Sequence, residues 1–140
     1  YTTLFRSTFV SNDFIANKMF EASNTAFLGK IDASDELLME VSPARNVTEQ
    51  TPPTFLWATS EDSLVPVQHS IRMAHALADN NIPFEIHVFE EGPHGLALAT
   101  QACALAKTQV NPEVARWIEL ADVWLMKRFA LELDEKTMYD

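Results

Sequence analysis

Asp62 and His94 are the residues of this sequence whose types and settings best suit chemistry. Asp62 lies in the acidic segment S-E-D-S-L-V-P-V, and His94 lies in E-G-P-H-G-L, between a proline and a glycine. A carboxylate that contacts an imidazole fixes the tautomer of the ring and stabilises the imidazolium that forms when the ring takes up a proton. Together the two side chains would supply the acid and the base of a hydrolytic triad.

Two predicted strands place these residues at one edge of a sheet. Residues 54–58 are a short apolar run behind a Pro-Pro pair, and residues 84–89 are mostly apolar and β-branched, so both segments suit strands. Asp62 follows the first strand and His94 follows the second. In a parallel strand-helix-strand unit both loops open at the carboxyl end of the sheet, so we expect the two side chains to meet there.

The helix that joins these strands is predicted from its start, its apolar face and its end. Pro66 is well placed at a helix start, and Asn80-Asn81 closes the run. Helical spacing puts four apolar residues on one face, which we expect to pack on the sheet. These residues are Ile71, Ala74, Leu77 and Ala78.

The motifs resemble the α/β-hydrolases of the small acetylesterase type, which are related to dienelactone hydrolases and to prolyl-oligopeptidase-type peptidases. In such enzymes an acidic loop ahead of V-P-V carries the triad acid, and a G-P-H-G loop carries the triad histidine. The resemblance is most specific over residues 51–98. It implies an α/β fold with parallel strands and flanking helices, with Asp62 as the triad acid and His94 as the base. Glu61 is the neighbouring candidate for the acid.

The nucleophile that this order of residues requires is not evident. In these hydrolases the serine precedes the acid in a G-x-S-x-G elbow, where small neighbours permit a strained turn. Six serines precede Asp62, and none has that setting: Ser7, Ser11, Ser23, Ser34, Ser42 and Ser60. We therefore expect residues 1–140 to be the C-terminal part of a single α/β-hydrolase domain, inactive alone, with its serine upstream of Tyr1.

The segments outside the strand-helix-strand unit also carry predictions. Residues 1–9 are strand-like, and residues 11–40 suit two short helices, the second starting near Ser34, where such hydrolases place a lid or cap. Residues 96–107 are rich in alanine and leucine and favour a helix. A longer closing helix starts at Asn111-Pro112 and is followed by an acidic tail at 133–140. Its apolar positions are Val114, Trp117, Ile118, Ala121, Trp124, Leu125 and Phe129.

Composition narrows the classes of partner. The chain is 47% hydrophobic and 21% charged, as in ordinary globular domains. Its net charge of -10 argues against nucleic acid and anionic membranes, which bind basic patches. No apolar run reaches the ~18 residues of a membrane span. The single cysteine, Cys103, fits a reducing compartment, so we expect a cytoplasmic location.

The remaining histidines predict no metal site and no cofactor. His87 alternates with apolar residues in a strand and suits a structural role, while His69 and His75 lie on a predicted helix and should be solvated. No set of His, Cys and carboxylates has metal-ligand spacing. The resemblance implies a carboxylic-ester hydrolase that acts on small acyl esters, and it leaves open whether the protein is a homo-oligomer. The alternatives are a prolyl-oligopeptidase-type peptidase and a non-catalytic, hydrolase-like binding domain.

Overall fold

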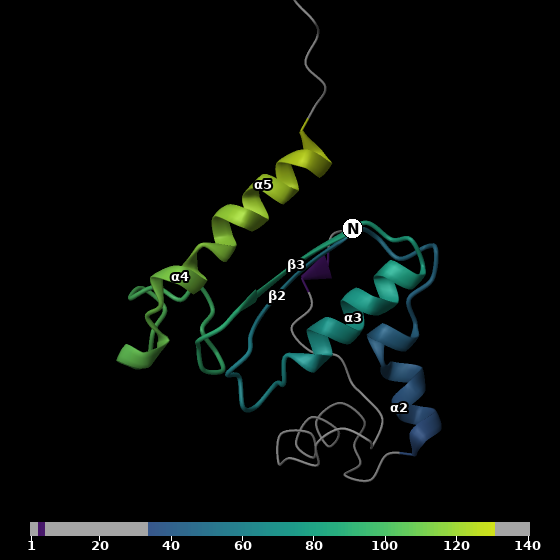
Figure 1. The fold of residues 1–140 in the computed structure, drawn as a ribbon, viewed down its shortest axis with the longest axis horizontal. Helices are drawn as coiled ribbons and strands as arrows, with labels where there is room; N and C mark the ends of the chain where they lie inside the picture. The colour runs from purple at the N-terminus through teal and green to yellow at the C-terminus, as the bar shows by residue number, and fades with distance from the viewer. Residues whose placement is uncertain (1–2, 5–33, 131–140) are drawn as a thin grey trace, which may run out of the picture.

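The computed structural model describes residues 3–4 and 34–130 of the chain (Figure 1). A short strand, β1 (Thr3–Leu4), is followed by helix α2 (Asp35–Val41), strand β2 (Thr54–Thr59), helix α3 (Gln68–Asp79), strand β3 (Phe84–Phe89), and helices α4 (Pro112–Ala115) and α5 (Trp117–Phe129). Single turns of 3-10 helix lie at Pro43–Arg45 and Lys107–Gln109.

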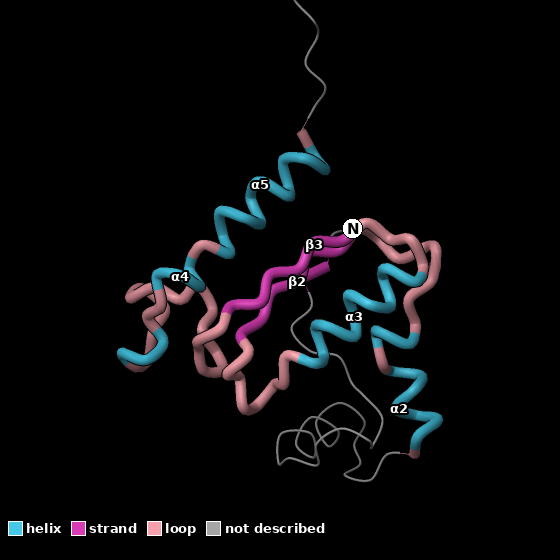
Figure 2. The backbone as a smooth tube through the Cα atoms, in the orientation of Figure 1, coloured by secondary structure: helices cyan, strands magenta, loops and turns pink. Residues whose placement is uncertain are grey.

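The sheet of the described residues has the order β1-β2-β3, and all its pairs are parallel (Figure 2). The register of the central pair runs from Thr54 opposite Phe84 to Thr59 opposite Phe89. Both predicted strands and their parallel pairing are therefore confirmed. Because the two strands end side by side, the loops that follow them leave the sheet at the same edge.

Helices α3 and α5 cover opposite faces of this sheet (Figure 1). Leu56 packs in a core cluster with Met73 and Leu77 of α3, whereas Phe55 packs with Ala121 and Trp124 of α5. Successive side chains of a strand point to opposite faces, so neighbouring residues of β2 serve two different cores. This two-sided burial explains why β2 reads as a continuous apolar run.

The predicted core face of α3 is partly wrong. Ala74 and Leu77 are buried as expected, but Met73 completes the buried row, and Ile71 is 51% exposed. Ala78 is also exposed. The helix is turned so that the Met73–Leu77 row faces Leu56, which leaves Ile71 and Ala78 on either side of the contact.

Helix α2 begins where the sequence predicts. The Oγ of Ser34 accepts a hydrogen bond from the backbone N–H of Leu37 at 3.3 Å and caps the first turn. Most of the predicted lid or cap at 11–40, including its first helix, lies outside the described residues. The acidic tail at 133–140 also lies outside them, as does all of the predicted strand at 1–9 apart from Thr3–Leu4.

The helix predicted over residues 96–107 is wrong, because this segment consists of turns ahead of the 3-10 turn. Ala97 and Ala99 adopt φ values of 50° and 54°, which no right-handed helix allows. Leu96 and Ala99 are buried in a cluster with Val114 of α4. Burial of these two residues in the tertiary structure therefore overrides the helix preference of the alanine-rich segment.

The closing helix starts as predicted but is split in two. The Oδ1 of Asn111 accepts from the backbone N–H groups of Glu113 and Val114 at 3.0 and 3.1 Å, which caps α4. Ala121 and Trp124 of α5 are buried, whereas three of the predicted apolar positions are exposed: Ile118, Leu125 and Phe129. Among the described residues, no helix combines the length and apolar character needed to cross a bilayer.

We predict that Leu77→Ala lowers the free energy of unfolding by about 2–5 kcal/mol, because Leu77 is fully buried and its truncation leaves a cavity. Ile71→Ala, on the exposed side of the same helix, should change it by less than about 0.5 kcal/mol. Urea unfolding followed by circular dichroism measures both. Equal losses in the two variants would contradict the observed rotation of α3.

Candidate active site

Asp62 is held in place by the backbone of its own loop. It follows β2 by a short turn, and its Oδ1 accepts hydrogen bonds from the N–H groups of Leu64 and Val65 at 2.9 and 2.8 Å. Such side-chain contacts to backbone groups two and three positions ahead stabilise turns that lead into helices. The carboxylate is therefore oriented by its own loop, independently of His94. The Asp62 side chain is only 16% exposed.

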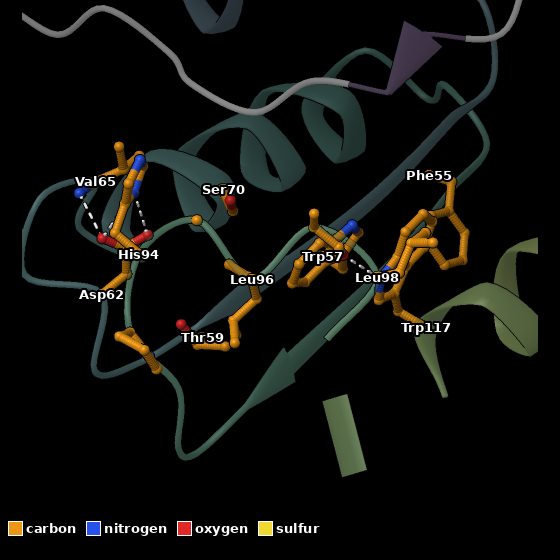
Figure 3. Close-up of a pocket in the computed structure, with 14 residues that line it drawn as sticks. Phe55, Trp57, Thr59, Asp62, Val65, Ser70, His94, Leu96, Leu98 and Trp117 are labelled. Carbon is orange, nitrogen blue, oxygen red and sulfur yellow. Dashed lines mark hydrogen bonds and ion pairs between the residues drawn. The ribbon is translucent and has the colours of Figure 1, made fainter. Parts of the chain in front are cut away.

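His94 contacts this carboxylate from the loop that follows β3 (Figure 3). Its Nδ1 lies 2.9 Å from Oδ2 of Asp62 and 3.2 Å from Oδ1. With the proton on Nδ1, the ring donates to the carboxylate, and Nε2 carries the lone pair that can accept a proton from another group. The arrangement can thus act as an oriented general base.

Glu61 does not contact the imidazole. Its Oε2 accepts a hydrogen bond from the backbone N–H of Gly92 at 3.1 Å. Of the two adjacent carboxylates, Asp62 is therefore the one paired with His94. Glu61 instead binds the backbone of the loop after β3 that carries His94, here called the histidine loop.

Further side chains tie the two loops together. The hydroxyl of Thr59 donates to the carbonyl of Gly92 at 2.7 Å, and that of Ser60 donates to the carbonyl of Glu90 at 2.6 Å. Gly92 is buried and has a φ of +140°, a conformation that side-chain-bearing residues rarely adopt. These partners of the loop were not predicted from the sequence.

A pocket of about 280 Å³ opens beside the Asp62–His94 pair. Figure 3 shows the pair at one end of this pocket and the Trp117 ring at the other. Trp57 and Trp117 stack with ring centroids 5.2 Å apart, and Nε1 of Trp117 donates to the carbonyl of Ala97 at 2.9 Å. The pocket therefore joins a polar, proton-accepting end to a largely apolar one.

Of the serines ahead of Asp62, the three that the structure describes show no setting for a nucleophile. Ser34 caps α2, Ser42 is 1% exposed, and the hydroxyl of Ser60 is bonded to the histidine loop. Ser7, Ser11 and Ser23 lie outside the described residues. Ser70 of α3 lines the pocket, and nothing in its helical sequence setting signalled this.

The other histidines stand apart from the pocket. His87 contacts Glu85 at 2.9 Å within β3, as a structural residue should, and the exposed His75 contacts Asp79 at 3.0 Å. His69 is half-buried, so the prediction that it is solvated is wrong. Within the part of the chain that the structure describes, no group of three or more His, Cys, Asp or Glu residues could hold a metal ion.

Parallel strands between helices, with an acid and a histidine in the loops after neighbouring strands, define the α/β-hydrolase class, and solved structures of that class share this fold. Residues 6–111 match the prolyl oligopeptidase family. The chain belongs to this family.

Several solved structures are similar to the chain. An acetyl ester-xyloside bifunctional hydrolase from Caldicellulosiruptor lactoaceticus is 37% identical, with a TM-score of 0.69 over 80% of this chain and 38% of its own. A sugar hydrolase from Lactococcus lactis is 35% identical, with a TM-score of 0.66 over 76% of this chain and 42% of its own. A carboxylesterase from Lactobacillus plantarum is 29% identical, with a TM-score of 0.67 over 79% and 40%.

A sequence comparison also finds a similar protein. Endo-1,4-beta-xylanase B of Butyrivibrio fibrisolvens is 47% identical over 66 residues, which are 47% of this chain and 10% of the xylanase. The chain thus spans a tenth of this relative and about two fifths of the solved structures.

We predict that Gly92→Ala destabilises the histidine loop. An added Cβ would lie 2.7 Å from Leu96 Cδ1 and 2.9 Å from Thr59 Cγ2, and the backbone strain alone is worth about 1–3 kcal/mol. Gly95→Ala is the matched control, since its φ is +82° but the nearest atom, Nε2 of Gln109, is 3.6 Å away. Thermal unfolding should show the larger loss for Gly92→Ala. The reverse order would contradict the packing of this loop.

Proposed function

We propose that the protein is a serine-type carboxylic-ester hydrolase of the acetylesterase kind, acting on small acyl esters. The observation that carries the proposal is the 2.9 Å contact between Oδ2 of Asp62 and Nδ1 of His94 at the carboxyl edge of the sheet. The names of two similar structures, a carboxylesterase and an acetyl ester-xyloside hydrolase, support the same class of substrate.

In the proposed reaction His94 transfers a proton in each of two half-reactions. A serine hydroxyl attacks the ester carbonyl while Nε2 of His94 takes its proton, and the imidazolium then gives that proton to the departing alcohol. Water repeats the sequence on the acyl-enzyme and releases the acid. Asp62 stays ionised throughout, holding Nδ1–H in place and stabilising the positive charge of the imidazolium.

The serine itself is proposed to come from residues outside this sequence. None of the serines ahead of Asp62 lies in G-x-S-x-G, and those that the structure describes serve as a cap, a buried residue and a loop contact. The 140 residues would then provide the acid and the base, and the elbow serine and the oxyanion hole would come from the remainder of the hydrolase domain.

A serine peptidase is the second candidate, because the family to which the chain belongs is named for prolyl oligopeptidase. The same Asp62–His94 pair would then protonate a departing amine instead of an alcohol. A non-catalytic binding domain is the third, and it is disfavoured because binding alone gives no reason to orient the imidazole with a carboxylate.

The test is ester hydrolysis by the chain extended upstream to include a G-x-S-x-G segment. We predict turnover of acetyl esters that falls by about 10⁴-fold or more in His94→Ala, and by about 10⁴-fold in Asp62→Asn, because both changes leave the serine without an oriented base. His75→Ala is the matched control, since His75 also contacts an aspartate but is highly exposed on α3.

Three results would contradict the proposal. Turnover of acetyl esters that survives His94→Ala would place the reaction at a different site. Cleavage of prolyl peptides without cleavage of acetyl esters would favour the peptidase. Esterase activity of the 140 residues alone that depends on His94 would mean that one of their own serines is the nucleophile.

A further inference from the structure

The contact between Asp62 and His94 joins two separate loops, so its length depends on what fixes one loop against the other. Asp62 is oriented by backbone N–H groups of its own loop. His94 has no such support from its immediate neighbours and lies two residues after Gly92, whose φ of +140° sets the direction of the chain. The placement of Gly92 therefore decides where the imidazole stands.

Both backbone polar groups of Gly92 are bound by side chains from the end of β2 and from the loop that carries Asp62. Its N–H donates to Oε2 of Glu61 at 3.1 Å, and its carbonyl accepts from the hydroxyl of Thr59 at 2.7 Å. Gly92 is buried, so water cannot easily replace either partner. These two side chains come from the residues just ahead of Asp62, at the carboxyl end of β2.

We propose that Glu61 and Thr59 are positioning residues that set His94 against Asp62 by clamping Gly92. This inference rests on the proposed function, in which His94 is the base. It assigns the two neighbouring carboxylates different tasks, because Asp62 contacts the imidazole and Glu61 contacts the backbone that carries it. Thr59 lines the pocket and Glu61 does not, so Glu61 is the cleaner of the two to test.

The clamp requires a hydrogen-bond acceptor at residue 61. It does not require a negative charge there. A glutamine there keeps an acceptor oxygen of the same reach, whereas an alanine removes it. Glu61 is exposed, so neither change disturbs a core. Glu91 is also an exposed glutamate and lies in the histidine loop, and Glu91→Ala is the matched control.

The experiment reads the ring of His94 directly in the upstream-extended protein labelled with ¹⁵N-histidine. The nitrogen shifts of a neutral imidazole report which nitrogen carries the proton, and the hydrogen bond made by that nitrogen selects the tautomer. We expect only the Nδ1-protonated form in the wild type and in Glu91→Ala. In Glu61→Ala the Nε2-protonated form should appear, and the Nδ1 proton should exchange with water several-fold faster.

Glu61→Gln should restore most of the wild-type spectrum, which a general loss of stability would not do. Thr59→Val, which removes the second contact, should resemble Glu61→Ala while the histidines of α3 keep their wild-type signals. An unchanged His94 spectrum in Glu61→Ala would overturn the assignment, as would equal changes in Glu61→Ala and Glu61→Gln.

The same spectra separate this inference from the proposed function. Asp62→Asn should abolish the preference for the Nδ1-protonated form whether or not the clamp exists. If the wild-type ring shows no such preference, the Asp62–His94 pair and the proposed function fail together. If Asp62→Asn acts and Glu61→Ala does not, only the clamp fails.

Discussion

The hydrogen bond between the Asp62 carboxylate and Nδ1 of His94 is the contact on which the site depends, and the parallel pairing of β2 with β3 makes it possible. Parallel strands that end in register deliver their following loops to one edge, where residues distant in sequence can meet. An antiparallel pair would send these loops to opposite ends of the sheet. The fold thus contributes to the site through strand direction before any side chain is considered.

Asp62 combines a folding role with the proposed catalytic one. Its Oδ1 accepts two backbone N–H groups that lead the chain toward α3, and its Oδ2 makes the shortest contact with the imidazole. A carboxylate that accepts from several donors is held in one orientation, as the partner of an oriented imidazole must be. The turn that starts the helix and the group that orients the base are therefore parts of one structure.

The sequence was sufficient to predict the features that depend on a few neighbouring residues. Both strands, the start of α2 at Ser34 and the cap at Asn111 follow from strand composition and capping chemistry, and they are found where predicted. The approach of Asp62 to His94 was also predictable, because it requires only strand direction and the positions of two loops.

Features that depend on tertiary contacts were not predictable. Residues 96–107 have the composition of a helix, but Leu96 and Ala99 are buried against α4, and the left-handed conformations of Ala97 and Ala99 follow from that packing. The rotation of α3 is set by the fit of Met73 and Leu77 to Leu56, which helical periodicity alone does not specify. The choice between Glu61 and Asp62 required the geometry of the loops.

A crystal structure of the upstream-extended protein after reaction with an organophosphate that modifies nucleophilic serines tests the central claim most directly. We predict that the modified serine oxygen lies about 2.6–3.2 Å from Nε2 of His94, with Asp62 still bound to Nδ1. A modified residue remote from His94, or a His94 ring turned away from Asp62, would contradict it.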